Sequence, residues 1–351
     1  AGLFSTLGNM INGNLLDTTH TTPDVLTLNK LMREMVDAGC EYSFMEVSSH
    51  AIHQERIDGL QFRGGIFSNI THDHLDYHKT FDEYIRVKKQ FFDELPDSAF
   101  ALINLDDRHG RVMLQNTQAR QRTYSLREVA SYRARIMEGL FEGMQLSLDG
   151  EEFWTPFVGR FNASNLVAVY GAGRELGWEQ REMLLAMSRL KPVGGRFETI
   201  RSGKGITAVV DYAHTPDALK NVLQAINDIR GPEQTLITVI GAGGNRDNKK
   251  RPLMATEAVR SSTKVIFTSD NPRDEEPRDI IDQMMEGVSF ADQIKVLTIT
   301  DRREAIRTAC TIARPGDIVL VAGKGHETYQ EVKGQKWHFD DREIIKEFFE
   351  Q

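Results

Sequence analysis

Apolar runs of strand length alternate with amphipathic stretches of helix length along the first part of the chain. The apolar runs lie at residues 44–47, 65–70 and 100–104, and two of the amphipathic stretches lie at residues 26–38 and 81–95. A period near 3.6 residues predicts helices, and short continuous apolar runs predict buried strands. Their alternation is typical of a mostly parallel sheet that helices cover.

The pattern changes in the middle of the chain. Residues 122–154 alternate between apolar and polar side chains, with glycines at turn positions. This predicts a small antiparallel section. Helical periodicity returns at residues 162–176 and 179–189.

A cluster of proline and glycine at residues 191–195 interrupts the pattern, and we predict a domain boundary there, between residues 1–191 and 192–351. Beyond it the alternation restarts, with strands predicted at residues 206–210, 235–240, 264–268 and 317–322. A polar loop follows each of these strands directly. Because the carboxyl ends of parallel strands lie at one edge of an open α/β sheet, the loops predict one composite binding site.

The loop after the third of these strands has the sequence TSDNPRDEEPR, from Thr268 to Arg278. Its Asp270, Asn271 and Arg273 offer an anion, an amide and a guanidinium, and Pro272 stiffens the turn between them. An amino acid fits this set, because its ammonium suits the carboxylate and its carboxylate suits a bidentate guanidinium. The same four residues also form an ordinary solvated turn, and the loop by itself leaves both interpretations open.

Composition restricts the class of protein. The chain has 351 residues, of which 27% are charged, and its formal net charge is −8. This balance argues against a nucleic-acid-binding surface, which depends on a basic patch. No apolar run approaches the ~18 residues of a membrane span. The only cysteines, Cys40 and Cys310, have no metal-binding spacing, so we expect free thiols in a reducing cytoplasm.

Motifs for phosphate and metal binding are incomplete. Residues 241–246 begin like the dinucleotide motif G-x-G-x-x-G, but Arg246 occupies the position of the last glycine. The phosphate-binding motif G-x-x-x-x-G-K-[ST] does not occur, so we expect the main phosphate cradle to lie outside this chain. The histidine-rich residues 71–78 and Glu46 are candidate ligands of a hard cation such as Mg²⁺, although a histidine-rich loop is more often merely solvated. Lys88 lies on a predicted helix and has no special status from its position alone.

Ten motifs in order along nearly the whole chain resemble the Mur ligase family, and within it the branch that adds meso-diaminopimelate. They are HTTPD, MEVSSHA, FSNITHDHLDYH, YIRVKK, GRFNASN, PVGGRFE, VVDYAHTPDAL, GAGGNRDNKKRP, DNPRDEEP and VAGKGHETYQ. Each motif is weak alone, whereas ten in the family's order are specific. The resemblance implies an α/β fold: a mostly parallel central-sheet domain of the P-loop type, truncated at its start, followed by a Rossmann-like C-terminal domain that binds the amino acid.

The resemblance also implies roles for individual residues. The muramoyl-dipeptide substrate would be held by Thr21, Thr22, Ser48, Gln54 and Arg56. Mg²⁺ would be held by Glu46, His74 and a carbamate on Lys88, and these three residues with Arg196 would be catalytic. The nucleotide would contact Asn162, Asn165, Arg196 and Asp211. The incoming amino acid would contact Arg246, Asp270, Asn271, Pro272, Arg273, Gly323 and Glu327.

The implied activity is that of an ATP-dependent ligase in peptidoglycan synthesis. It would join meso-2,6-diaminopimelate to UDP-N-acetylmuramoyl-L-alanyl-D-glutamate through an acyl phosphate. Arg273 favours diaminopimelate, because lysine-adding relatives replace the arginine of this motif. In the family a uridine-binding domain and a P-loop precede the residues with which this chain begins, so we expect a truncated chain of weak activity. We further expect a cytoplasmic monomer that binds neither nucleic acid nor membrane.

Two alternatives stay open. The first is another ligase of the superfamily, either lysine-adding or a folylpolyglutamate synthetase, and Arg273 with the pair Asp270 and Asn271 argues against it. The second is a fragment that binds its ligand without catalysis.

Overall fold

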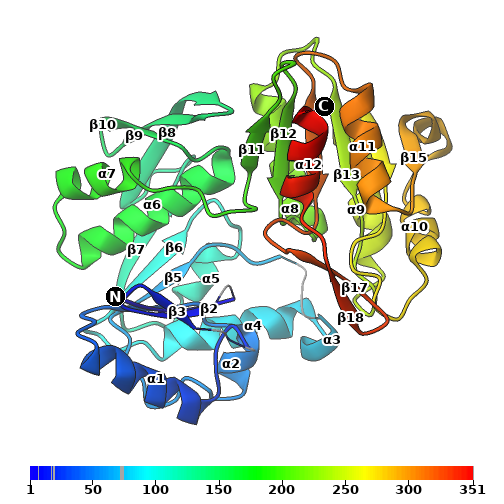
Figure 1. Ribbon diagram of the computed structural model, residues 1–351. Helices are drawn as coiled ribbons and strands as arrows, with labels where there is room; N and C mark the ends of the chain where they lie inside the picture. Colours follow the sequence, from blue (N-terminus) through cyan, green and yellow to red (C-terminus); the bar gives the residue numbers. More distant parts are fainter. Residues whose placement is uncertain (7, 17, 19, 72–74, 351) are drawn as a thin grey trace. The chain divides into compact units, whose positions relative to one another are not determined.

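The computed structural model describes residues 1–350 except 7, 17, 19 and 72–74. The chain forms two compact units that are interleaved in sequence (Figure 1). The first consists of Ala1–Arg133 and Val167–Trp178, and the second of Ala134–Leu166 and Glu179–Gln351. The sequence predicts one boundary after residue 191, and that boundary stays a prediction.

The first unit opens with a small sheet of order β3-β2-β1-β4. Its strands are β1 (Gly2–Ser5), β2 (Gly8–Ile11), β3 (Asn14–Leu16) and β4 (Ser43–Met45). β1 pairs antiparallel with β2 and parallel with β4. The sequence analysis missed β1 to β3, because strands of three or four residues are too short to show a period.

Four helices of the first unit follow in the same stretch: α1 (Val25–Asp37), α2 (Ser49–His53), α3 (Leu75–His78) and α4 (Phe81–Asp93). Asp24 caps α1, since its carboxylate accepts hydrogen bonds from the amides of Leu26 and Thr27. Thr80 caps α4 in the same way through the amide of Glu83. The apolar face of α4 packs into clusters with β5 and β6 and with α1, through residues such as Phe92 and Val87.

A second sheet has the order β10-β9-β8-β7-β6-β5. Its strands are β5 (Gly64–Phe67), β6 (Phe100–Asn104), β7 (Arg120–Ser125), β8 (Tyr132–Leu140), β9 (Gly143–Leu148) and β10 (Glu151–Thr155). Pairing is parallel from β5 to β8 and antiparallel from β8 to β10. The antiparallel section predicted from residue 122 therefore starts one strand later. The short helix α5 (Gly110–Met113) follows β6, and α6 (Arg160–Glu175) and α7 (Gln180–Ser188) follow β10.

The second unit contains a six-stranded sheet of order β11-β12-β16-β13-β14-β15. Its strands are β11 (Glu198–Arg201), β12 (Thr207–Asp211), β13 (Leu236–Ile240), β14 (Lys264–Phe267), β15 (Val296–Thr298) and β16 (Ile318–Ala322). All neighbours pair in parallel except β11 with β12. The four strands predicted from the sequence are confirmed within one residue at each end.

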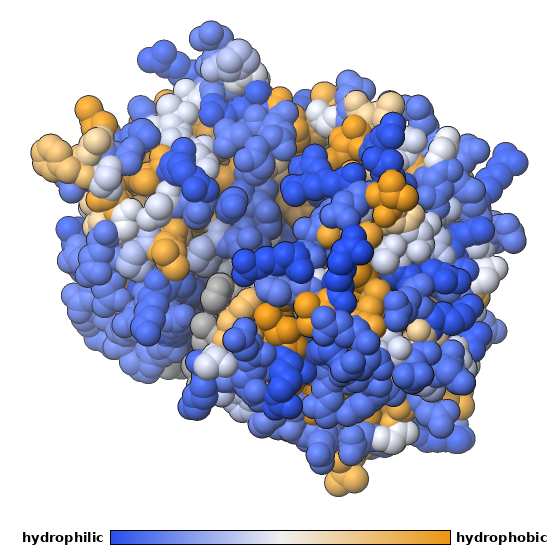
Figure 2. Space-filling view, turned by 180° about the vertical axis from the view of Figure 1, so that it is seen from behind, coloured by the Kyte–Doolittle hydropathy of each residue, from blue (hydrophilic) through white to orange (hydrophobic). Residues whose placement is uncertain are grey.

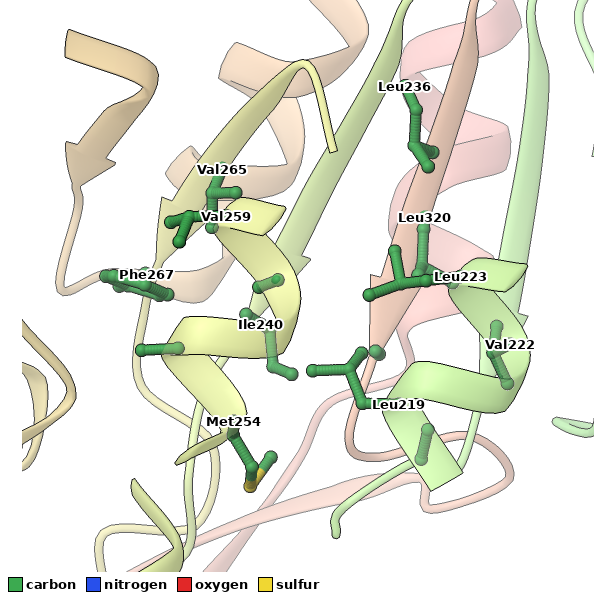
Figure 3. Packing of buried hydrophobic residues seen from close by; sticks show 14 of the residues in the cluster. Leu219, Val222, Leu223, Leu236, Ile240, Met254, Val259, Val265, Phe267 and Leu320 are labelled. Atoms are coloured by element: carbon green, nitrogen blue, oxygen red, sulfur yellow. The ribbon is translucent and has the colours of Figure 1, made fainter. Parts of the chain in front are cut away.

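Helices cover both faces of this sheet. They are α8 (Pro216–Ile229), α9 (Lys250–Ser261), α10 (Pro277–Met285), α11 (Arg302–Ile312) and α12 (Asp341–Glu350), with a 3₁₀ helix η1 (Phe290–Lys295) before β15. On one face, α8 to α10 bury a cluster in which Leu223 of α8 meets Leu320 of β16 (Figure 3). On the other face, α11 and α12 bury a second cluster. Burial on both faces explains why β13 and β16 are almost wholly apolar.

A two-stranded hairpin, β17 (Tyr329–Val332) with β18 (Gln335–His338), leaves the loop that follows β16. Both cysteines are free, as the sequence analysis expects. Hydrophilic residues predominate on the face of the molecule in Figure 2, where apolar residues gather only in small groups. Within the described part of the chain, no helix is both long and apolar enough to span a membrane.

The core of the second unit provides a test of the packing. Leu223 is fully buried, whereas Leu253 of the neighbouring helix α9 is 57% exposed. We expect Leu223→Ala to lower the free energy of unfolding by about 3 kcal/mol, because it removes buried methyl groups and leaves a cavity. Leu253→Ala is the control, with an expected change under about 0.5 kcal/mol. Urea unfolding followed by circular dichroism measures both, and equal losses would contradict the described packing.

Candidate functional site

The loops at the carboxyl ends of β12, β13, β14 and β16 are packed tightly against one another. A Cβ atom on Gly244, in the loop after β13, would lie 1.9 Å from the carbonyl oxygen of Pro272, in the loop after β14. A Cβ atom on Gly323, after β16, would lie 2.7 Å from Oδ2 of Asp270, and this glycine has a φ of +112°. Glycine is therefore required at both positions. The structure brings together the loops that the sequence predicts to form one site.

Asn271 is the buried centre of this edge. Its Nδ2 donates to Oε2 of Glu327 at 2.8 Å, and its Oδ1 accepts from Nζ of Lys324 at 3.1 Å and from the amide of Glu331 at 2.9 Å. The Lys324 ammonium, itself fully buried, also donates to Oε2 of Glu327 at 3.1 Å. Donor and acceptor ends of the amide are both used, so the Asn271 side chain has one orientation. It fixes Glu327 relative to the loop after β14.

Arg273 is held by its backbone and by its side chain. Its φ is +52°, and its amide donates to Glu331 O while its carbonyl accepts from the amide of Lys333. Nη1 donates to Gly244 O at 2.8 Å, and Nε lies 3.4 Å from Oε2 of Glu331. The side chain is 23% exposed. The side chain is therefore partly accessible to solvent, and the hairpin holds its backbone.

Asp270 is more withdrawn than the sequence suggests. The residue is only 8% exposed, and its Oδ1 accepts from the amide of Asn271 at 2.8 Å. Its Oδ2 lies 4.0 Å from Nη1 of the buried Arg302. The carboxylate thus faces the interior of the edge as well as the site.

Arg251 is an important residue that the sequence analysis missed. It is fully buried, and its two terminal nitrogens donate to both carboxylate oxygens of Glu275, at 2.7 and 2.9 Å. It also donates to Gly243 O at 3.0 Å, and so anchors the glycine-rich loop after β13. The neighbouring Arg246 is exposed. Nothing in the polar run around these arginines indicates which of them is buried.

Asp211 ends β12 and is buried. Its Oδ2 accepts from the amide of Phe197 at 2.8 Å, and burial raises the pKa of its carboxyl from an ordinary value of 3.8 to about 6. Arg196, next to Phe197, places its guanidinium 4.7 Å from the ring centre of Tyr212. These residues join the segment before β11 to the carboxyl end of β12.

Asn162 and Asn165, the other candidate nucleotide contacts, lie on α6. Asn162 donates from Nδ2 to Val158 O at 2.9 Å, one turn earlier in the chain. Asn165 is exposed.

In the first unit, Glu46 and Lys88 lie close to the end of β4. Oε2 of Glu46 accepts from the amide of Thr6 at 3.0 Å and from its hydroxyl at 2.8 Å. Nζ of Lys88 donates to Val47 O at 3.0 Å. Burial lowers the pKa of the Lys88 amine, and the nearby Glu46 carboxylate partly opposes this effect. Lys88 thus has a larger neutral fraction than a solvated lysine. His74 lies outside the described residues.

The candidate dipeptide-binding residues form one connected group beside Glu46. Thr22 donates to Glu46 O at 2.8 Å, and Arg56 donates to Thr22 O at 3.0 Å and to Oε1 of Gln54 at 3.0 and 2.6 Å. Gln54 and Arg56 line an open cavity of about 380 Å³. Ser48 caps α2 by accepting from the amide of Ala51, and the hydroxyl of Thr21 lies 3.0 Å from that of Thr6. The structure therefore gathers residues that are up to 35 positions apart, from Thr21 to Arg56.

Comparison with known proteins places this geometry in a family. Residues 1–173 match the Mur ligase middle domain, and residues 195–325 match the Mur ligase glutamate ligase domain. A protein of Phocaeicola vulgatus named UDP-N-acetylmuramoyl-L-alanyl-D-glutamate--2,6-diaminopimelate ligase is 58% identical over 348 residues, which cover 99% of this chain and 72% of that protein. The chain belongs to the Mur ligase family.

Other relatives agree with this assignment. A protein of the same name from Parabacteroides distasonis is 59% identical over 348 residues, which cover 99% of this chain and 72% of that protein. A solved structure of a UDP-N-acetylmuramoyl-L-alanyl-D-glutamate--2,6-diaminopimelate ligase superposes with a TM-score of 0.68 at 36% identity, covering 99% of this chain and 72% of that one. The Mur ligase fold predicted from the ten motifs is confirmed.

The raised pKa of Asp211 in this Mur ligase predicts a pH dependence of stability. The folded chain holds this proton more tightly than the unfolded chain, so the free energy of unfolding due to Asp211 falls as pH rises from about 4 to 6 and stays lower above that range. Asp211→Asn removes the charge, while its amide oxygen can still accept from Phe197. We therefore expect the difference in free energy of unfolding between the variant and the wild type to shift in favour of the variant by about 1 to 3 kcal/mol when the pH is raised from 4 to 7.5.

Urea unfolding at the two pH values measures this gain. Asp228→Asn is the control, because Asp228 is an exposed carboxylate on α8. A relative stability of Asp211→Asn that does not change with pH would show that Asp211 titrates as an ordinary carboxyl.

Proposed function

We propose that this Mur ligase joins meso-2,6-diaminopimelate to UDP-N-acetylmuramoyl-L-alanyl-D-glutamate at the expense of ATP. The observation that carries the proposal is Arg273, which the backbone of the β17–β18 hairpin aims at the edge where the loops after β13, β14 and β16 meet. Similarity at 58% identity to a ligase of that name supports the same substrate. The chain spans 72% of the length of these relatives.

The reaction needs activation of a carboxylate. A free carboxylate is a poor acyl donor, because its leaving group would be an oxide ion. Transfer of the γ-phosphoryl group of ATP to the substrate carboxylate gives an acyl phosphate. The amine of diaminopimelate then attacks the acyl carbon, the C–O bond to phosphate breaks, and the amine loses a proton. Charge neutralisation on the phosphoryl group and exact positioning of the amine are the tasks left to the protein.

The second unit supplies the amino-acid contacts. Diaminopimelate differs from lysine by one carboxylate at its far end, and the guanidinium of the partly exposed Arg273 suits that group through charge-assisted hydrogen bonds. The Glu327 carboxylate, which Asn271 fixes, suits an ammonium group, and Gly323 lies beside the Asp270 carboxylate of the same edge. Arg246, exposed beside Gly243, adds a second cation. Asn162, Asn165, Arg196 and Asp211 serve the nucleotide.

The first unit supplies the dipeptide and metal contacts. Thr21, Thr22, Ser48, Gln54 and Arg56 hold the muramoyl dipeptide. Mg²⁺ supplies charge neutralisation when bound, and the residues that would hold it are Glu46, His74 and a carbamate on Lys88. The donor set fits a hard cation only if Lys88 carries such an anionic oxygen group, because an ammonium repels Mg²⁺. The proximity of Lys88 to the carboxyl end of β4 and to Glu46 supports this role. We further propose that the enzyme is cytoplasmic and monomeric.

Arg273 tests the substrate. In the protein purified as its gene encodes it, we expect tripeptide formation with diaminopimelate and little with lysine. Arg273→Ala should raise the KM for diaminopimelate by about tens to thousands of fold, because the loss of such a charge pair costs roughly 2–5 kcal/mol. Arg273→Lys should raise it less. The KM values for ATP and the UDP-dipeptide should stay within about twofold.

Arg278→Ala is the matched control, since Arg278 is exposed on α10 and pairs with Asp282 of the same helix. A wild-type preference for lysine would establish the lysine-adding activity instead. Ligand binding without any product would indicate a non-catalytic binding protein.

Lys88 tests the metal site. Incubation with ¹³C-labelled bicarbonate should give one carbamate signal in the NMR spectrum of the protein, because CO₂ adds to a neutral, partly buried amine. Lys88→Arg should abolish this signal, and Lys89→Arg should keep it, since Lys89 is paired with Asp93. Persistence of the signal in Lys88→Arg would assign the carbamate to another amine and remove Lys88 from the metal site.

A further inference from the structure

Arg302 occupies the first position of α11 and lies in the interior of the second unit. It is 1% exposed. Its Nε and Nη2 donate to the two carboxylate oxygens of Asp341, at 2.8 and 2.7 Å, in the first turn of α12. Nη2 also donates to Ala322 O, the last residue of β16, at 3.0 Å. A bidentate ion pair therefore joins α11, α12 and the end of β16.

The remaining nitrogen of this guanidinium faces the amino-acid loop. Nη1 of Arg302 lies 4.0 Å from Oδ2 of Asp270. Neither atom has a hydrogen-bond partner among the residues that the structure describes, and both atoms are buried. One guanidinium thus stands between two buried carboxylates. It neutralises Asp341 through direct hydrogen bonds and Asp270 only through a longer electrostatic contact.

The position of Asp270 affects the neighbouring residues of the site through direct contacts. Its Oδ1 accepts from the amide of Asn271, whose side chain holds Glu327. Its Oδ2 fills the space that a side chain on residue 323 would need. A buried carboxylate that loses its nearest cation must move toward solvent or acquire a proton, because an isolated buried charge is unfavourable. Movement of the carboxylate disturbs its contacts with Asn271 and Gly323, whereas protonation removes its negative charge from the loop.

We propose that Arg302 is a positioning residue of the amino-acid site, which it serves by holding Asp270 from behind. The proposal rests on the function proposed above. Because the guanidinium makes its direct hydrogen bonds to Asp341 and only a longer contact to Asp270, the charge of Asp270 is only partly compensated. The loop after β14 therefore retains a negative potential that favours an ammonium group of the incoming amino acid. α12 contributes to amino-acid binding through this chain of charges without contacting the ligand.

The neighbouring Arg303 provides a matched control. It also links α11 to α12, through an ion pair with Glu347, but this pair is about half exposed and lies on the outer surface. Arg303→Met removes one ion pair between these helices, as Arg302→Met does. Only Arg302 faces Asp270.

The test measures steady-state kinetics of the protein purified as its gene encodes it. Arg302→Lys keeps a cation but loses the planar fork, and we expect it to raise the KM for diaminopimelate about tenfold, with the KM for ATP within twofold. Arg302→Met should have a larger effect. Arg303→Met should change neither KM more than twofold. A purely structural role of Arg302 would lower the melting temperature without separating the two KM values.

A double-mutant cycle examines the route of the effect. Asp270→Asn alone should raise the KM for diaminopimelate, and adding Arg302→Lys to it should cost less than a further twofold, because the two residues act in series. Multiplicative effects in the double variant would overturn the proposal, as would a diaminopimelate KM unchanged in Arg302→Lys. Both variants of the cycle are conservative, so the test holds even when Arg302→Met does not fold. A wild-type protein that makes no product with diaminopimelate would overturn the proposed function as well. The wild-type assay alone therefore distinguishes failure of the proposed function from failure of the role of Arg302.

Discussion

The buried amide of Asn271 joins the ends of two neighbouring loops, and the arrangement of the proposed amino-acid site depends on it. Through one side chain it fixes Glu327, Lys324 and the backbone of Glu331. Each of these groups would be costly to bury without a partner, and together they satisfy one another. The loop after β14 and the loop after β16 therefore behave as one rigid piece. Rigidity of this kind keeps a guanidinium and a carboxylate at a fixed separation before any ligand arrives, so little ordering is left for binding to accomplish.

Much of this fold can be predicted from the sequence, because the strands and helices leave local patterns of apolar and polar residues. β12, β13, β14 and β16 are buried on both faces, so their apolar runs stand out, and the polar residues that follow them mark the site. Residues 270–273 are predicted as site residues because they come directly after such a strand. The ten motifs add the prediction of the family. The hairpin β1–β2 and the strand β3 are not predicted from the sequence, because tertiary contacts decide the pairing of very short strands and such strands show no period in the sequence.

The buried arginines show the limit of sequence reasoning more clearly. Arg251 and Arg302 are fully enclosed, yet each stands in a polar stretch that also contains exposed arginines. A guanidinium is buried only when carboxylates from elsewhere in the fold reach it, as Glu275 and Asp341 do here. These partners are 24 and 39 positions away along the chain. Helical or strand periodicity carries no information about such distant pairs. The burial of Lys88 beside the end of β4 is hidden from the sequence for the same reason.

The bridge between Arg273 and the β17–β18 hairpin has a consequence for how substrate choice changes in this family. The left-handed backbone of Arg273 is stabilised by residues near position 332, so the direction of its side chain is set by a segment nearly sixty residues further along the chain. Grafting the loop alone from a relative with another substrate would transfer the side chain that is proposed to recognise the substrate, but not the hairpin that supports it. With the role proposed for Arg273, an exchange of specificity requires both the loop and the hairpin. Variation in the hairpin would then alter selectivity while every residue proposed to contact the ligand stays unchanged.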